Sequence, residues 1–390
     1  GSQEKGFDFY SAHFFAAKGG LVKQLAVGDF QAQFGQGLTY WSGAAFANAI
    51  EVSSIKRIAS RLRPYTSAQE NEFLRGVGTT LKWGQIQLTV FYSSKKRDAN
   101  LWEDNQGFSE KTIRSFPNHG FHRTPSEIEN KDAVRENTLG GNFSIQKGNL
   151  ALGSTIIHNH LNAAYAPQIQ TYNQFAIKKE WQSNWGFDFS YVSKNWNLFG
   201  EFSKSIAKGQ AYTLGAIVVL DPKLSIGLQH RDFATDFLAI QSNAVGQTST
   251  NANVRATSIG MQLHLLENLS LSANVEQFKF PWLRFQTNAP SRGKKAFLQL
   301  SYTPSKKLDL YLRFSQKDDQ KDEKKEYLAI SKLQWERTVN YRLHLSYQAS
   351  KEIEIRSRVE MSSFQQQQIG SEKGILLYQD WRFQRRGSPF

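Results

Sequence analysis

Residues 340–361 read NYRLHLSYQASKEIEIRSRVEM, and this stretch decides the fold class because its side chains alternate in character. Leu343 and Leu345 fall on an apolar face, which Ile353 and Ile355 continue after a tight turn at 349–351. The opposite face is polar: Arg342, His344, Ser346, Gln348, Glu354, Arg356, Arg358 and Glu360. A period of two predicts two antiparallel strands joined as a hairpin. One face suits lipid, and the other suits water.

The same hairpin pattern recurs along the chain. Tight connections fall at 18–20, 84–85, 147–149, 195–196, 221–223, 267–268, 304–307 and 350–351. Longer polar segments lie near 36–71, 99–135, 164–183, 238–252, 281–293, 318–331 and 365–373. The strands between them have about ten residues, the length that crosses a bilayer when tilted. The sequence therefore predicts an all-β fold: a transmembrane antiparallel up-and-down β-barrel of about 16 or more strands, with short periplasmic turns and long extracellular or in-folded loops.

A soluble β-sandwich is the alternative, since alternation also describes a half-buried sheet. Two features favour the membrane barrel: long, even strands, and aromatic residues beside turns and loops, where interfacial girdles form. The tryptophans in question are Trp41, Trp83, Trp181, Trp185, Trp196, Trp282, Trp335 and Trp381. We expect one barrel domain over 1–390. It reads as an incomplete segment of a larger barrel, because hairpin counting gives about 17 strands and single-chain bacterial barrels have even numbers.

Composition and motifs narrow the function. The chain of 390 residues has no cysteine, which excludes disulfides and thiolate metal sites. It carries no nucleophile elbow, zinc-protease, P-loop or dinucleotide-binding motif, so we expect no enzyme and no cofactor. The net charge is +14, with 48 Lys and Arg against 34 Asp and Glu. Because a lipid-facing band tolerates little charge, this excess belongs to the lumen, loops and turns.

Metal-binding candidates are weak. His158 and His160 are spaced to share one face of a strand, but a structural site needs about four ligands, so we expect lumen or interface histidines and no metal. His119 and His122 are similarly isolated. The charged run at 317–326 lacks the spacing of a calcium loop and reads as a solvated loop.

The first long segment, 36–71, is the most basic feature. Its basic residues are Lys56, Arg57, Arg61 and Arg63, with Arg75 just beyond, and they are interleaved with Tyr40, Trp41, Tyr65 and Phe73. That mixture suits polyanion binding by phosphate pairing and stacking. The favoured alternative is a plug loop folded into the lumen. Its arginines would pair with the lumen wall formed by Arg342, Glu354, Arg356, Arg358 and Glu360, through the carboxylates of Glu354 and Glu360.

Several stretches carry a family resemblance. They are GFDFYSAHFF (6–15), LAVGDFQAQFGQGLTYWSG (25–43), SIKR (54–57), RPYTSAQENEFLRG (63–76) and LTVFYSSKKRDAN (88–100), with a looser match over 333–390. The chain resembles large outer-membrane proteins of Bacteroidetes-type bacteria, in which a helix-hairpin-helix region similar to that of competence proteins precedes a β-barrel. That region is absent here. The resemblance implies an integral bacterial outer-membrane location, in contact with lipid and lipopolysaccharide.

Two function classes follow. The first is a porin-like transport channel or conduit, with polyanions or DNA for uptake as candidate cargo. The second is a non-enzymatic structural component of an outer-membrane protein complex, which docks an envelope protein partner or the missing barrel strands at an open strand edge. In the second case, segments 7–15 and 375–383 should present the open edges. Fold alone does not choose between these classes.

Overall fold

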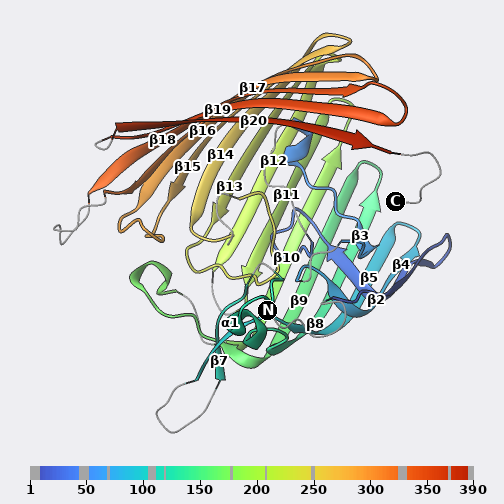
Figure 1. Cartoon of the computed structure of the whole chain (residues 1–390). Coiled ribbons are helices and arrows are strands. Elements are labelled where there is room, and N and C mark those ends of the chain that lie inside the picture. Colours follow the sequence, from blue (N-terminus) through green and yellow to red (C-terminus); the bar gives the residue numbers. More distant parts are fainter. Residues whose placement is uncertain are drawn as a thin grey trace.

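The computed structural model describes residues 9–43, 52–67, 71–103, 111–117, 120–175, 179–206, 209–246, 251–323, 332–367 and 370–384. Nearly all of them lie in one large sheet, drawn in Figure 1. In this part of the chain no helix is long and apolar enough to cross a membrane. The segment 44–51, which supplies most of the small residues of the first long loop, lies outside the described ranges.

The sheet contains 20 strands. Their bounds are β1 His13–Ala17, β2 Val22–Gln33, β3 Arg61–Pro64, β4 Leu74–Trp83, β5 Ile86–Arg97, β6 Asn100–Glu103, β7 Lys111–Ser115, β8 Val134–Lys147, β9 Leu150–Tyr165, β10 Lys179–Val192, β11 Trp196–Ser205, β12 Gln210–Asp221, β13 Leu224–Phe233, β14 Val254–Leu266, β15 Leu269–Phe280, β16 Ser291–Ser305, β17 Leu308–Asp322, β18 Leu333–Gln348, β19 Ile353–Gln366 and β20 Gly370–Phe383. Three short helical segments accompany them: η1 Val52–Ile55, α1 Pro125–Glu129 and η2 Thr171–Asn173.

Each long strand pairs antiparallel with the next long strand, from β2 through β4, β5, β8 and β9 to β20. The short strand β1 pairs with β2, β3 adds to the end of β2, and β7 makes a brief parallel contact with β9. Sixteen strands have ten residues or more, so the expected fold class and strand number are confirmed.

The short turns also fall where the sequence places them, at 84–85, 148–149, 222–223, 267–268 and 306–307. Some boundaries were wrong. The short strands β3, β6 and β7 lie within segments expected to be loops. Residues 317–322 of the charged run continue β17 rather than forming a solvated loop, because Asp318 and Lys321 pair with Arg337 and Glu336 of the neighbouring β18. The helix α1 was not expected, although its capping box, Thr124 with Glu127, is readable in the sequence TPSE.

Side chains alternate across the sheet as the opening hairpin predicts. Leu312 and Leu343 are about half exposed on the outer face, whereas Arg313 and Arg342 line an interior cavity. Most of the tryptophans expected in the girdles are exposed: Trp83, Trp181, Trp185, Trp196, Trp335 and Trp381. Trp282 is half-buried, and Trp41 is 8% exposed because its loop folds inward.

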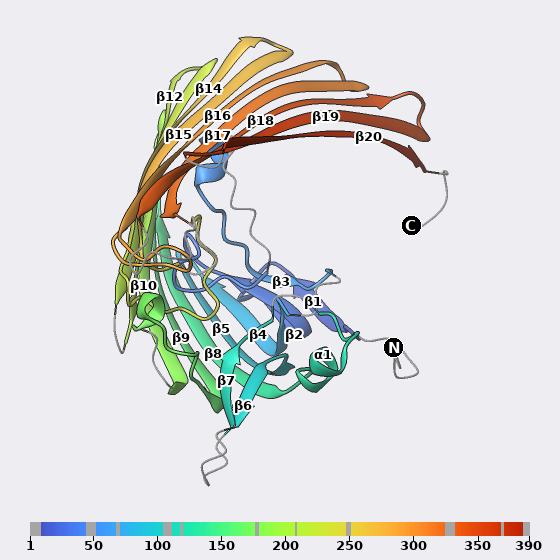
Figure 2. The ribbon, with the colours of Figure 1, turned by 60° about the vertical axis from the view of Figure 1, so that its left-hand side comes forward.

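The sheet curves into a C in cross-section, as Figure 2 shows, with β1 and β20 on either side of the opening. Within the described ranges β20 is hydrogen-bonded only to β19, and no pairing joins β1 to β20. The outward side chains of β20 are widely exposed, with Ile375 and Leu377 both at 69%.

Buried apolar side chains gather in three clusters on the concave side and at the loop end of the first strands. The first contains Phe30, Phe34, Tyr40 and Phe91, which pack ring against ring. These clusters exist because loops cover the inner wall there. The loops are therefore the elements that position any site in the lumen.

Candidate functional site

A first in-folded loop, residues 34–43 and 52–65, crosses the interior between β2 and β4; its helical turn η1 lies against β12–β14 (Figure 2). Val52 and Ile55 of η1 are buried at 4% and 2% exposure. They enter a hollow made by Gly227 and Gly260, which face each other across β13 and β14. A Cβ atom on Gly227 would lie 2.8 Å from Ile55 Cδ1, so only glycine leaves room for this turn.

The start of the first loop is fixed to the wall by one carboxylate. Glu201 of β11 accepts backbone N–H hydrogen bonds from Gln36 (2.6 Å), Leu38 (3.0 Å) and Thr39 (2.8 Å). Gly35 and Gly37 have φ of 53° and 84°, and this left-handed backbone turns successive N–H groups toward one anion. Glu201 is 3% exposed. Both of its carboxyl oxygens are therefore satisfied by the loop itself.

A second glycine allows the loop to approach the wall. Gly186 of β10 lies under Thr39, and a Cβ atom there would come within 1.8 Å of Thr39 Oγ1. The wall is thus shaped for this loop at two places, beneath η1 and beneath Thr39.

A second in-folded loop, residues 234–246 after β13, holds the first one. Trp41 N donates to Gln241 O at 2.9 Å, and Asn243 N donates to Gly37 O at 2.9 Å. The phenol of Tyr40 donates to the side chain of Gln241. From its sequence we expected this segment to be a polar loop. Its apolar residues Phe237, Leu238 and Ile240 indicate in-folding, because a loop surrounded by water would expose these side chains to solvent.

Three basic residues of the first loop lie inside the barrel, but on separate parts of the wall. Lys56 Nζ donates to Ser190 Oγ (2.6 Å) and Asn197 Oδ1 (2.8 Å). Arg61 Nη2 donates to Ser144 Oγ at 2.8 Å. The guanidinium of Arg57 lies 5.1 Å from the centre of the Trp41 ring. Burial lowers the pKa of Arg57 to about 10, so it remains charged at neutral pH.

The other two predicted basic residues differ. Arg63 is exposed on β3, and Arg75 belongs to β4, where it pairs with Asp29 of β2 at 2.7 Å. The interleaved aromatic rings are not available for stacking with a base. Tyr40, Trp41, Tyr65 and Phe73 are all buried, at 1%, 8%, 2% and 5% exposure. The structure therefore does not bring these residues together as one basic and aromatic surface.

The predicted wall residues lie on the inner face of β18 and β19, but their pairing with the loop arginines was wrong. Glu360 accepts from Arg342 at 2.7 and 3.0 Å. Glu354 accepts from Arg356 at 2.8 and 3.0 Å and lies 3.6 Å from Arg382. Arg358 lies over the ring of Tyr378. Neighbours in the same strands reach these carboxylates first, because cross-strand and i,i+2 partners share one face.

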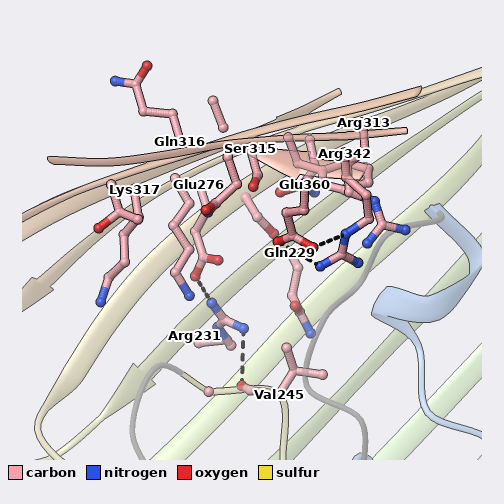
Figure 3. A pocket seen from close by; sticks show the side chains of 18 residues that line it. Gln229, Arg231, Val245, Glu276, Arg313, Ser315, Gln316, Lys317, Arg342 and Glu360 are labelled. Carbon is pink, nitrogen blue, oxygen red and sulfur yellow. Dashed lines mark hydrogen bonds and ion pairs between the residues drawn. The ribbon is translucent and has the colours of Figure 1, made fainter. Parts of the chain in front are cut away.

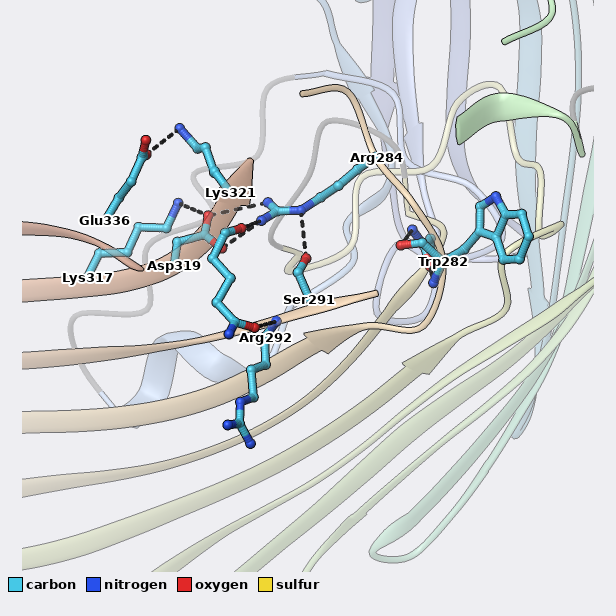
Figure 4. Close-up of polar contacts among 10 residues, drawn as sticks. Trp282, Arg284, Ser291, Arg292, Lys317, Asp319, Lys321 and Glu336 are labelled. Atoms are coloured by element: carbon cyan, nitrogen blue, oxygen red, sulfur yellow. Dashed lines mark hydrogen bonds and ion pairs between the residues drawn. The ribbon is translucent and has the colours of Figure 1, made fainter. Parts of the chain in front are cut away.

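Ion pairs also close the loop end of β15–β18, which Figure 4 shows. Arg284 Nη2 lies 2.7 Å from Asp319 Oδ1, and Lys317 Nζ lies 3.2 Å from the other oxygen of that carboxylate. Lys321 pairs with Glu336 at 2.9 Å. These contacts hold the extended β17 and β18 together beyond the sheet's middle.

Beyond the two loops the lumen stays open. A cavity of about 460 Å³ lies on the inner face of β13–β19, bounded by Val245 and Gly246 of the second in-folded loop. Figure 3 shows the charged side chains that project into it, among them Arg231 of β13, Glu276 of β15 and Arg342 of β18.

None of the candidate histidines that the structure describes belongs to a cluster that could hold a metal ion. His158 is exposed and bonds to Ser183 Oγ at 2.7 Å, and His122 pairs with Asp98 at 3.2 Å. Among the described residues no group of three or more metal-ligating side chains occurs. His119 lies outside them.

No protein-family model and no curated protein matches the chain. Solved structures share its general form. OccAB3 of Acinetobacter baumannii has 11% identity over 80% of this chain and 94% of its own, with a TM-score of 0.39. OpdO of Pseudomonas aeruginosa has 12% identity over 82% and 83%, also at 0.39. The ferric yersiniabactin uptake receptor FyuA of Yersinia pestis has 11% over 80% and 56%, at 0.41. These similarities are distant. The fold assignment rests on this chain's own strands.

Proposed function

We propose that this protein is an integral β-barrel channel of a bacterial outer membrane, surrounded by lipid and lipopolysaccharide. The observation that carries the proposal is an apolar outer face along sixteen long strands, combined with an inner face that is polar and borders a cavity over β13–β19. A wall of this kind encloses water in hydrocarbon. The two in-folded loops narrow that aqueous path, because they are fixed to the wall rather than projecting from it.

Single-channel recording in planar bilayers tests this proposal. The native chain should give a small conductance, and deletion of residues 44–60 should enlarge it by removing the middle of the first loop. The point variant Lys307→Gln, at the short turn between β16 and β17, serves as the control and should match the native chain. If neither the native chain nor the deletion variant conducts, the channel proposal fails.

A polyanion such as DNA is the narrower proposal for the cargo. The net charge of +14 supports it, whereas the buried aromatic rings of the first loop give it no stacking surface. Replacing Lys56, Arg57, Arg61 and Arg63 with Gln should abolish salt-sensitive binding of single-stranded DNA if the first loop is the site. Gln at Lys147, Lys223, Lys306 and Lys307, all in or next to short turns, gives the same charge change as a control. Equal losses in both variants would mean diffuse attraction without a site.

A second candidate is a non-enzymatic assembly component, and the free edge of β20 favours it. In hydrocarbon each unpaired backbone group costs several kcal/mol, so a strand edge of this length requires a hydrogen-bonded strand alongside. The fitting occupant is a β-strand of an envelope protein, apolar toward lipid and polar toward the lumen, to match Leu377 and Asp380 of β20. A photo-crosslinking residue at Leu377 should then capture one defined protein in native membranes, and the same residue at outward Leu312 should not. No adduct at Leu377 would remove this candidate.

The resemblance to Bacteroidetes-type barrels with a helix-hairpin-helix region stays a prediction. That the chain is one domain and part of a larger barrel is likewise a prediction.

A further inference from the structure

The open cavity carries more positive than negative charge. Its charged lining residues are Arg231, Glu276, Lys295, Arg313, Lys317, Arg342 and Glu360. Two internal pairs account for both carboxylates: Arg231 with Glu276, and Arg342 with Glu360. Lys317 is paired with Asp319 at 3.2 Å. Lys295 and Arg313 are the cations left over.

The register of the strands places cations of the cavity lining opposite each other, so their repulsion destabilises the sheet when no anion is bound. Lys295 lies directly opposite Lys317 across β16 and β17, and Arg313 lies directly opposite Arg342 across β17 and β18. Like charges directly opposite each other destabilise a sheet. Two such pairs side by side on one inner face form a local positive field, which a bound anion would relieve.

The guanidinium of Arg313 is held in a fixed orientation by uncharged neighbours. Arg313 gives Nε and Nη2 hydrogen bonds to the neutral amide oxygen of Gln299, at 2.8 and 2.6 Å. Its guanidinium lies 5.3 Å from the ring centre of Phe297 and 4.8 Å from that of Tyr311. These contacts fix the group's orientation but leave its charge unpaired.

Lys295 makes no hydrogen bond or ion pair with the described residues; its amine lies 5.9 Å from the ring centre of Phe278. No described residue occupies its three N–H donors, which can therefore serve a ligand. Ser315 and Asn340 face each other between the two cations and offer neutral polar groups. The cavity's volume of about 460 Å³ lies in the usual range for small-molecule pockets.

We propose that this cavity is a binding site for small solutes bearing an oxyanion, a carboxylate or a phosphate, held by Lys295 and Arg313. The inference rests on the proposed channel function, since it names the class of solute that the open part of the lumen would retain. Lys295 lies opposite Lys317, four residues along β17 from Arg313, a rise of about 13 Å, so the two cations hold separate oxyanionic groups rather than one. One group takes the N–H donors of Lys295 and the other takes the remaining N–H groups of Arg313, so that the charge of each cation is neutralised.

Equilibrium binding to the full chain in detergent micelles tests the site, with inorganic phosphate, succinate and a single-stranded oligonucleotide as probes in calorimetry. Phosphate or succinate should bind to the native chain, and the probe that binds identifies the oxyanion source. The double variant Lys295→Gln/Arg313→Gln should weaken that binding at least about tenfold, because two charge-assisted contacts are lost. Lys307→Gln, with one lysine changed at the turn joining the same two strands, should bind like the native chain. Heat-modifiable migration in gels verifies that each variant is folded.

Unchanged affinity in the folded double variant would overturn the site, as would binding of the oligonucleotide alone, which would point to nucleic acid instead. Conductance is measured separately on the same preparations. Binding lost in the double variant while the native chain fails to conduct would keep the site and remove the channel. Conductance with no binding of either small anion would do the reverse.

Discussion

The two halves of the wall use the same strand pattern but meet different surroundings. Under the loops, inward residues such as Phe91, Phe199 and Phe233 are at most 3% exposed. Beyond Phe280, no apolar side chain in the described residues is buried, and the inner face of β16–β20 carries arginines and glutamates. We call these the covered half and the open half.

The difference teaches that alternation fixes which way a side chain points but not what it meets there. An inward position becomes core when a loop reaches it and stays wet when none does. The covered half is accordingly adapted to its loops, with glycines at 186, 227 and 260 beneath them and a carboxylate at Glu201 to receive backbone donors. Among the described residues, loop segments cover the open half only where Val245 and Gly246 border the cavity, and the charges of this half pair mainly along the wall.

The largest expected effect is loss of the carboxylate that holds the first loop. Glu201→Ala leaves three buried N–H groups without an acceptor, each costing about 1–3 kcal/mol. The free energy of unfolding measured in urea should therefore fall by at least about 3 kcal/mol. Conductance should rise as the loop loosens. Glu354→Ala in the open half removes the same group from a solvated pair and should change neither quantity appreciably. Equal losses of stability at Glu201 and Glu354 would contradict the proposed difference between the covered half and the open half.

Substitutions on the outer, lipid-facing side should have the same effect in the covered half and in the open half. Leu214→Arg in β12 and Leu312→Arg in β17 place a cation at positions 48% and 54% exposed on the lipid side. Each should lower the free energy of unfolding in bilayers by about 2–4 kcal/mol. Ser362→Arg, on the inner face of β19 between the neutral partners Asn340 and Gly374, is the control and should cost much less because water reaches it. A tolerated arginine at either leucine would contradict the assigned faces.

A glycine-to-alanine comparison should give opposite signs. Gly186→Ala drives a methyl group into Thr39 and should destabilise the protein by about 1–3 kcal/mol. Gly374→Ala in β20 has no atom within 4 Å of the added Cβ, so the alanine should be neutral or stabilise by up to about 1 kcal/mol. Equilibrium unfolding of both variants decides the matter, and a neutral Gly186→Ala would mean that Thr39 is not held against the wall.

The smallest effect is expected at the rim. Lys321 is 40% exposed where it pairs with Glu336, so Lys321→Ala should cost less than about 1 kcal/mol. That cost should fall further in high salt, because the pair is screened. A larger, salt-independent loss would show that this end of β17 and β18 is as tightly organised as the covered half.

Period-two alternation and turn chemistry allow the strands, turns and faces to be predicted, because both are local properties of the chain. The partners of the loop residues could not be predicted. We expected the first loop's arginines to pair with Glu354 and Glu360, but Glu360 pairs with Arg342 of the adjacent strand and Glu354 with Arg356 of its own strand. Glu201 was not considered, since its role depends on backbone donors more than 160 residues away. Inward glycines and the apolar FLAI segment were the available signals, and they become meaningful only once the facing loop is known.

The contact between Glu201 and the first loop also sets an order of events. Gln36 and Glu201 are 165 residues apart, and Gln229 reaches Ile55 across 174. Pairing of adjacent strands closes only short loops, whereas these contacts require β11 and β13 to be in place beforehand. The wall therefore assembles first, around an unobstructed interior, and the first loop seats last. During biogenesis the barrel would pass through a wide-bore intermediate, and the rate at which it becomes narrow would depend on Glu201 more than on any strand-strand pair.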